Sequence, residues 1–446
     1  MKHQNIYQAI LPVAALAFVF SACTFEQEDF FEESASLRIQ HTNEKVKNIL
    51  CQGSEQNGWL IQYFVAGTED YNFEGFNLFG RFYDNGKVTL SSNHRYLRNG
   101  KAGSYTEYTS FYEMLAEEGP VLSFDTWNDV LTVFVDPVSP SSAPGVLVSD
   151  GEGMHGDDRL VLSSYNENEL NFRGERYTAP VRFVRLDRSP EEYLVLTTVA
   201  KMVFAGGKID EYSLSNGSVT KYISGLSNGY FDYVERLDDP LDRSVLSCVF
   251  TSNGFRTKDP FVVGNDTVQE FVLDLDNDCL VCGNVVMKAC WQRSLGRWLA
   301  QNGTVTITNE GNSDSFNALY NAVSDAITSA FSAQEFTSMC FGTSNETARN
   351  RRTGLVFTMK TSNKTYQVGF TGSARMDGDK MVLSFDPSDY SSNYSTYEKN
   401  GIGTQFLDFV TAMNGTYTLS SNSYFAPSKI VATKDGDPNF SFTMHM

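Results

Sequence analysis

One stretch of the chain matches a catalytic pattern. Gly225-Leu226-Ser227-Asn228-Gly229 fits the G-x-S-x-G pattern of serine hydrolases. That pattern requires a strand before it and a helix after it, with an acid and a histidine later in the chain. Here the residues that follow, Tyr230 to Val234, alternate as a strand does, and the only later histidine is the penultimate residue, His445. We therefore interpret the stretch as a turn.

Few cysteine or histidine spacings in the sequence are suited to binding a transition metal. Cys279-Leu280-Val281-Cys282 is a lone C-x-x-C, whereas a zinc site of this kind needs a second pair. Buried thiols are the expected state, and a disulfide or soft-metal site that includes Cys290 is the alternative. The histidines after residue 22 contain no pair at ligand spacing. They are His41, His94, His155 and His445.

A run of acidic residues resembles the start of a calcium loop. In Asp274-Leu275-Asp276-Asn277-Asp278 the side-chain oxygens alternate along the chain. An EF-hand loop would continue with Gly and end with Glu, but Cys279 and Val285 occupy those positions. We expect an acidic turn here, with a calcium site completed by distant ligands as the alternative, and we expect no cofactor.

Sugar chemistry would need residues that only the fold can bring together. The two carboxylates of a glycoside hydrolase must converge in space, and 54 acidic residues do not indicate which two would do so. A glycan-active hydrolase with an unrecognised carboxylate pair therefore stays an alternative. Tryptophans either stack on sugar rings or lie in the core. They are Trp59, Trp127, Trp291 and Trp298.

The N-terminus has the pattern of an export signal. An apolar run from Ala9 to Phe20 follows Lys2, and it is shorter than the ~20 residues of a membrane-spanning helix. Ser21 and Ala22 then precede Cys23, which resembles the bacterial lipobox. We expect a signal peptide over residues 1–22 and lipidation of Cys23. An ordinary signal peptide is the alternative, because Phe20 stands where Leu is usual.

An acidic tether over residues 23–33 follows the expected lipidation site. Glu26, Glu28 and Asp29 resemble the surface-export signal of Bacteroidota lipoproteins. We therefore expect a protein anchored to the outer membrane by its lipid and facing the cell exterior, with the periplasmic face as the alternative. The acyl chains would insert into the membrane and the polypeptide would not.

A second candidate modification site lies at Thr267. Asp266-Thr267-Val268 resembles the three-residue O-glycosylation acceptor of exported Bacteroidota proteins. Such tripeptides are common by chance, so the site is a hypothesis.

Composition restricts the class of protein. The net charge is −19, which argues against a nucleic-acid partner because phosphate binding needs a basic face. Aromatic residues make up 13% of the chain, and they favour sheet.

Periodicity predicts a few helices among many strands. Helices are predicted over 34–50, 189–204, 314–331 and 404–413, the second with a capping box of Ser189 and Glu192. Most other segments read as short strands, such as a hairpin over 77–90 that turns at Asp84-Asn85-Gly86. We predict an α+β fold, mainly antiparallel sheet, with an N-terminal β-rich domain at 34–188 and a C-terminal α+β domain at 189–446.

A repeated pentapeptide suggests internal duplication of these two halves. Val121-Leu122-Ser123-Phe124-Asp125 recurs as Val382-Leu383-Ser384-Phe385-Asp386. Each copy precedes a short apolar stretch, at 130–135 and 406–410.

Several blocks together resemble an uncharacterised Bacteroidota surface lipoprotein family, classified as a domain of unknown function. Besides the lipobox and tether, the blocks are Phe31-Glu32-Glu33-Ser34-Ala35, Asn57-Gly58-Trp59, Tyr83-Asp84-Asn85-Gly86-Lys87-Val88 and Leu122-Ser123-Phe124-Asp125-Thr126-Trp127-Asn128. The similarity covers about residues 23–190 and extends loosely into the C-terminal half. It implies a setting beside starch-utilisation-like uptake systems and contains no catalytic motif.

The function we expect is a non-enzymatic surface lipoprotein that helps to capture glycan or peptide for uptake, with outer-membrane uptake proteins as partners. The alternatives are the hydrolase described above and a structural or adhesive surface protein. Capture predicts a row of exposed aromatic side chains over a groove, whereas hydrolysis predicts two or three convergent acids with perturbed pKa values in a cleft. Adhesion predicts neither.

Overall fold

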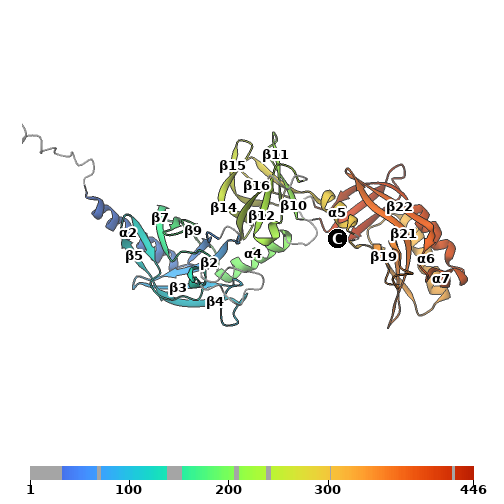
Figure 1. Ribbon diagram of the computed structural model, residues 1–446, viewed down its shortest axis with the longest axis horizontal. Coiled ribbons are helices and arrows are strands. Elements are labelled where there is room, and N and C mark those ends of the chain that lie inside the picture. Colours follow the sequence, from blue (N-terminus) through green and yellow to red (C-terminus); the bar gives the residue numbers. More distant parts are fainter. Residues whose placement is uncertain are drawn as a thin grey trace, which may run out of the picture.

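The computed structural model describes residues 33–67, 72–137, 153–204, 210–237, 243–301, 303–423 and 427–445. They form one nine-stranded antiparallel sheet and two closed eight-stranded barrels, which follow one another along the chain. Figure 1 shows the N-terminal sheet, the first barrel and the second barrel in a row. The expected mainly antiparallel β architecture with a few helices is confirmed. The N-terminal sheet lies within 34–188, and both barrels lie within 189–446.

The N-terminal sheet is a meander whose last strand pairs with its first. Its strand order is β4-β3-β2-β1-β9-β8-β7-β6-β5. The strands are β1 (Trp59–Tyr63), β2 (Phe76–Phe82), β3 (Lys87–Ser92), β4 (Thr106–Phe111), β5 (Glu113–Ala116), β6 (Pro120–Ser123), β7 (Arg159–Tyr165), β8 (Glu169–Gly174) and β9 (Pro180–Arg185).

The two edge strands of this sheet, β4 and β5, are separated along the chain by Tyr112 alone. The sheet must therefore curl until its opposite edges come close together. Helix α2 (Ala35–Ser54) contacts strands from both halves of the curl, β1 and β2 as well as β5 and β6. It buries Val46, Ile49 and Leu50 there, so this amphipathic helix fills the curl and supplies part of its core.

The first barrel follows helix α4 (Pro190–Phe204), and its strand β10 pairs with its strand β17. Its strands are β10 (Glu211–Ser215), β11 (Thr220–Ser224), β12 (Tyr230–Val234), β13 (Arg243–Thr251), β14 (Gly254–Val263), β15 (Asp266–Asp274), β16 (Cys279–Cys282) and β17 (Val285–Ala289). A 3-10 helix, η1 (Leu226–Asn228), precedes β12. Because the barrel is closed, none of these strands offers a free edge.

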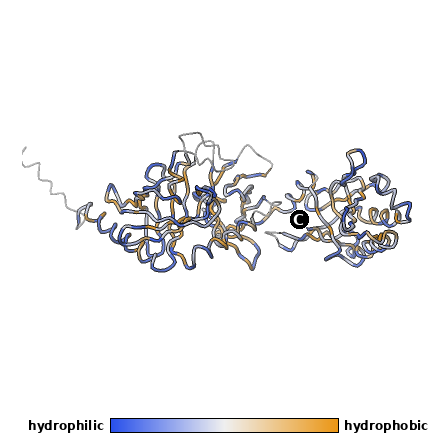
Figure 2. The backbone as a smooth tube through the Cα atoms, turned by 90° about the horizontal axis from the view of Figure 1, so that it is seen from below, coloured by the Kyte–Doolittle hydropathy of each residue, from blue (hydrophilic) through white to orange (hydrophobic). Residues whose placement is uncertain are grey.

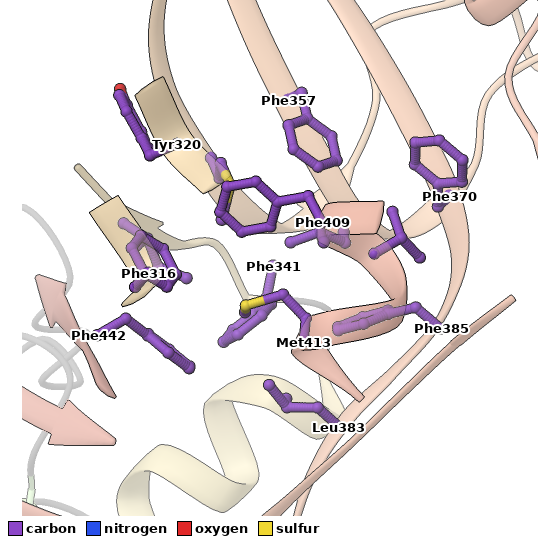
Figure 3. Close-up of a cluster of buried hydrophobic side chains, with 14 of the residues drawn as sticks. Phe316, Tyr320, Phe341, Phe357, Phe370, Leu383, Phe385, Phe409, Met413 and Phe442 are labelled. Atoms are coloured by element: carbon purple, nitrogen blue, oxygen red, sulfur yellow. The ribbon is translucent and has the colours of Figure 1, made fainter. Parts of the chain in front are cut away.

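The second barrel follows helix α5 (Trp291–Ala300), and β18 pairs with β25 to close it. Its strands are β18 (Val305–Ile307), β19 (Glu335–Thr343), β20 (Thr353–Lys360), β21 (Thr365–Asp377), β22 (Lys380–Tyr390), β23 (Gly415–Ser421), β24 (Lys429–Lys434) and β25 (Ser441–His445). Helices α6 (Asp314–Ala330), α7 (Tyr394–Lys399) and α8 (Gly403–Met413) pack with it. Figure 3 shows Phe316 of α6 and Phe409 of α8 meeting strand residues such as Phe442 in one apolar core.

The four predicted helices are present. Ser189 and Glu192 form the predicted capping box of α4, because each side chain bonds the other residue's backbone N–H at 3.2 Å. The predicted hairpin over 77–90 is β2–β3, and Gly86 at its turn has φ 78°, which favours glycine. Helix α5 and the short helices α3 (Thr132–Val135) and α7 were not predicted.

The repeated pentapeptide occupies comparable places in two of the three units. The first copy runs through β6 and the second through β22. The apolar stretch after each copy is helical, in α3 and in α8. A helix followed by a meander whose first and last strands pair occurs three times, beginning at α2, α4 and α5; the pairing closes a barrel in the last two.

Candidate functional site

The residues predicted to direct export lie outside the described part of the chain. These are Cys23, Glu26, Glu28 and Asp29. The described chain enters α2 through Ser34, whose side chain accepts a hydrogen bond from the Leu37 N–H. No helix among the described residues is long and apolar enough to cross a membrane.

Thr267, the candidate O-glycosylation site, is exposed on β15. The Asp266 carboxylate beside it accepts hydrogen bonds from Asn216 and Asn284 at 2.7 and 3.1 Å. Asp266 therefore supports the local turn, while Thr267 lies on the surface.

The G-x-S-x-G stretch is a turn, as predicted. Gly225 and Gly229 flank η1 with φ values of 81° and 77°, and β12 rather than a helix follows. Ser227 lies in the first barrel, whereas His445 lies in β25 of the second barrel.

The cysteines and acidic runs do not form a metal site. Cys279 and Cys282 lie three residues apart in strand β16, a spacing that points side chains to opposite faces. The six cysteines within the described ranges are free thiols. The Asp274 carboxylate accepts the N–H groups of Asp276 and Asn277, which makes an acidic turn. Within the described ranges no three histidine, cysteine or acidic side chains gather as a metal site would require.

Two buried acids have raised pKa values, and both have structural contacts. Burial raises the pKa of Asp157, whose carboxylate accepts the N–H groups of Arg176 and Tyr177 at 2.9 and 3.1 Å. Burial also raises the pKa of Glu211, which pairs with Arg293 and Arg297. Asp157 belongs to the N-terminal sheet and Glu211 to the first barrel, so they are not a convergent pair.

The tryptophans separate clearly by exposure. Trp59 and Trp291 are buried, with 0% and 2% of their surface exposed, and Trp298 packs partly against the second-barrel core. Trp127 is 47% exposed. It is therefore the one tryptophan positioned to stack on an external ligand.

Trp127 lies in the segment that covers the free edge of strand β4. The Thr126 hydroxyl accepts the Phe111 N–H at 3.0 Å, and the Asn128 amide donates to the Tyr108 carbonyl at 3.2 Å. Side chains thus replace a neighbouring strand along this edge. Because Asn128 is fully buried and also bonds Ser110 at 2.9 Å, the backbone on both sides of Trp127 is held to the sheet.

Two exposed aromatic residues and one arginine lie along this segment and strand β4, and we call Phe111, Trp127 and Arg98 the β4 platform. Phe111 is 49% exposed on the outer face of β4. The Arg98 guanidinium lies 5.3 Å from the Trp127 ring centroid and pairs with Asp136 at 2.6 Å. The Trp127 indole N–H donates to Asp129, so the polar edge of the ring is satisfied while its body stays exposed.

Part of this site was visible in the sequence. Trp127 was one of four sugar-stacking candidates, and it lies in the block Leu122 to Asn128 that carries the family resemblance. Phe111 and Arg98 were not identified. The signal for Phe111 is an aromatic residue at an outward position of a polar strand, which can be recognised only when the pairing of β4 is known. Arg98 lies in the β3–β4 connection and has no local signal.

Comparisons with solved structures give weak similarity. The chain is 10% identical to the DNA polymerase III β chain of Streptococcus pneumoniae TIGR4, over 90% of this chain and 97% of that one, with a TM-score of 0.14. For the Helicobacter pylori β clamp bound to a DNA ligase peptide, the identity is 10%, the coverage 91% and 98%, and the TM-score 0.12. TM-scores this low carry no argument about fold or function.

No curated protein matches the chain. The family model described as "Domain of unknown function (DUF4302)" matches residues 27–275. That range contains the whole N-terminal sheet and the first barrel as far as β15. The match covers more than half of the chain, and the protein therefore belongs to the DUF4302 family.

Proposed function

We propose that the protein is a lipid-anchored outer-membrane lipoprotein that captures glycan at the cell surface for uptake, without catalysing a reaction. Cys23 would carry the lipid, and the acidic tether with Glu26, Glu28 and Asp29 would direct the protein to the cell exterior. Outer-membrane uptake proteins would receive the captured glycan. The β4 platform is the observation that supports capture.

The platform suits a sugar ring for a physical reason. An exposed indole offers a flat apolar surface to the C–H face of a pyranose. The hydrogen bond that its N–H donates to Asp129 fixes the orientation of the ring. Trp127 loses little conformational freedom on binding because hydrogen bonds on both sides already hold its backbone. Arg98 and the exposed side chains of Glu107 and Thr109 supply polar groups for sugar hydroxyls.

Glycan is favoured over peptide because the β4 edge is already occupied. A peptide that binds by strand addition needs free backbone N–H and C=O groups along a sheet edge. Thr126 and Asn128 engage those groups at Phe111 and Tyr108. The aromatic side chains of the platform stay exposed, whereas the backbone groups that a peptide strand would need are already hydrogen-bonded.

Binding of soluble residues 34–446 to neutral oligosaccharides, measured by calorimetry together with product analysis, tests the proposal. An aromatic anchor at a binding site typically contributes ~2 kcal/mol, so Trp127→Ala should weaken binding by about 30-fold. Tyr230→Ala is the matched control, because Tyr230 is also an exposed aromatic side chain but lies in the first barrel.

Three outcomes would contradict capture at the platform. Equal losses in Trp127→Ala and Tyr230→Ala would place the site elsewhere. Released sugar products would point instead to the hydrolase. No binding to any neutral oligosaccharide would favour a structural or adhesive surface protein.

A further inference from the structure

A groove of about 1020 Å³ lies where the first barrel meets the second. Its walls come from β10, β11 and β17 of the first barrel, from the start of α5, and from the β21–β22 turn of the second barrel. Figure 1 shows α5 in this position, between the two barrels. The volume is sufficient for several sugar rings, and the groove is separate from the β4 platform.

The lining of the groove is basic in a chain of net charge −19. Four cationic side chains line it, and Asp379 is the one acid among its lining residues. The cations are Arg236, Lys288, Arg293 and Arg297. A local excess of positive charge on an acidic protein attracts anions selectively to that place.

Buried Glu211 holds two of these arginines in position. Its side chain is 3% exposed and lies 3.3 Å from Arg293 Nε and 3.0 Å from Arg297 Nη2. Asp210 also pairs with Arg297 Nη2, at 3.1 Å. Both ion pairs of Arg297 run through Nη2, and among the described residues no hydrogen bond engages its Nε or Nη1, so these donors can face a ligand. Planar guanidinium groups held in this way recognise carboxylate and sulfate oxygens well.

Arg236 adds a positive charge that no acid among the described residues pairs with. It is exposed two residues beyond the end of β12, and within the described part of the chain it has no hydrogen bond or ion pair. The N-terminus of α5 adds a favourable field for an anion, because its N-cap, Cys290, makes no side-chain capping bond. The lining also includes neutral polar side chains suited to hydroxyl groups. They are Ser213, Thr220, Tyr222 and Gln292.

We propose that the groove between the barrels binds an acidic oligosaccharide, with Arg236, Arg293 and Arg297 taking its carboxylate or sulfate groups. A saccharide is favoured over an acidic peptide because both barrels are closed, so the strands that line the groove have no free edge for a peptide to extend. The ligand would contact both barrels, since Met376 and Asp379 belong to the β21–β22 hairpin.

Calorimetric titration of soluble residues 34–446 tests this site with defined probes. The probes are a galacturonate hexamer for carboxylate, a heparin-derived hexasaccharide for sulfate, a maltohexaose as the neutral control and hexaglutamate as the acidic peptide. We expect one or both acidic saccharides to bind, and we expect the affinity to fall at least tenfold between 50 and 300 mM NaCl. We expect neither maltohexaose nor hexaglutamate to bind in the groove.

Charge reversal at the unpaired arginine separates the groove from general electrostatics. Arg236→Glu should weaken the acidic saccharide at least tenfold, and Arg236→Gln should weaken it less. The control is Arg349→Glu, an exposed arginine in the β19–β20 connection with the same charge change. Arg236→Glu should cause the same loss in a Trp127→Ala background as in the wild type, which distinguishes failure here from failure of the β4 platform.

Three results would overturn the proposal. One is an equal loss in Arg236→Glu and Arg349→Glu. Another is binding of hexaglutamate while both acidic saccharides stay unbound. The third is no saturable binding of either acidic saccharide at 50 mM NaCl, with circular dichroism showing a folded protein.

Discussion

The junction between the N-terminal sheet and the first barrel differs in kind from the junction between the two barrels. At the first junction the Gly75 N–H donates to the Cys248 carbonyl, and the Asn77 amide donates to the Phe250 carbonyl, each at 2.8 Å. Lys258 reaches across to the Val65 carbonyl at 2.9 Å. Each of these bonds ends on a backbone carbonyl of the other unit, so together they hold the two units in a defined position.

Charged and apolar contacts reinforce this first junction. Glu270 of the first barrel pairs with Arg182 of the N-terminal sheet at 3.0 Å and with Arg256 of its own barrel at 3.1 Å. Helix α4 adds an apolar contact, where Tyr193 packs with Leu60 and Phe79 of the sheet. Figure 2 shows these two units lying against each other along a broad contact.

The junction between the two barrels is narrower than the junction between the N-terminal sheet and the first barrel. Helix α5 packs in the second-barrel core, and its Arg293 and Arg297 pair with Glu211 of the first barrel at 3.3 and 3.0 Å. Ser423 of the second barrel donates to Asp278 of the first at 2.9 Å, and the basic groove also lies between the barrels. Figure 2 shows the second barrel reached through a narrow connection. We infer that the N-terminal sheet and the first barrel unfold together, and that the second barrel is a separate cooperative unit.

The largest effect expected concerns acid stability of the first two units. Burial lowers the pKa of His94 to about 4, and its Nε2 lies 2.9 Å from the Val130 carbonyl. Between pH 6.5 and 4 the His94 imidazole is therefore protonated in the unfolded chain but neutral in the native chain. The free energy of unfolding falls as the pH falls through this range. One group with this shift changes stability by ~3 kcal/mol.

His94→Gln should remove most of this pH dependence, because a neutral amide replaces the titrating ring. Urea titrations at pH 7 and pH 4 measure it, and the difference between the wild type and the variant isolates the histidine. The free energy of unfolding of the second barrel should change by the same amount between pH 7 and pH 4 in the wild type and in the variant. A matching change in the second barrel would show that the barrels are coupled.

A second test overpacks the first junction. A Cβ on Gly75 would lie 2.4 Å from Phe64 and 2.8 Å from Val249 of the first barrel. Gly75→Val should therefore cost about 1–3 kcal/mol in the transition shared by the sheet and the first barrel. The control is Gly119→Val, since nothing lies within 4 Å of a Cβ at Gly119. A loss confined to the sheet, with the first barrel unchanged, would contradict the shared transition.

A third test removes one bridging donor. Lys258→Met leaves the Val65 and Ala66 carbonyls without the ammonium that now donates to them at 2.9 and 3.3 Å. The expected cost is ~1–2 kcal/mol in the same shared transition. Lys364→Met, at an exposed lysine of the second barrel, is the comparison. Equal small effects in both variants would mean that this contact contributes little to the junction.

The smallest effect is expected at the second junction. Ser423→Ala removes the hydrogen bond to Asp278, and an interaction of this type at a partly exposed place contributes at most ~1 kcal/mol. Urea titration should show almost unchanged midpoints for all three units. A loss as large as that of Lys258→Met would mean that the bond between Ser423 and Asp278 holds the two barrels as firmly as Lys258 holds the first junction.

The sequence predicted the local structure better than the assembly. Turns and caps such as Asp84-Asn85-Gly86 and Ser189 with Glu192 are determined by neighbouring residues, and they form as predicted. Strand β14 contains Pro260, which argues against a strand in a local reading, and the structure accommodates it with a register shift between Arg256 and Phe261. Barrel closure depends on pairing between distant strands such as β10 and β17, which no local pattern encodes.

Both candidate sites illustrate the same limit. Trp127 could be named from composition, but its exposure depends on the hydrogen bonds of Thr126 and Asn128 to β4. Helix α5 carries Trp291, Leu295 and Leu299 at helical spacing, and this local pattern is enough to indicate an amphipathic helix. The charge of the groove, by contrast, arises only when β12 and α5 come together, and sequence reasoning had no access to it.

Pulsed hydrogen exchange along a urea titration of soluble residues 34–446, read by mass spectrometry of peptides, tests the comparison most directly. We predict that peptides from the N-terminal sheet and from the first barrel lose protection at one shared urea concentration, and that peptides from the second barrel lose it at another. A first barrel that unfolds with the second barrel, or apart from the N-terminal sheet, would contradict the account.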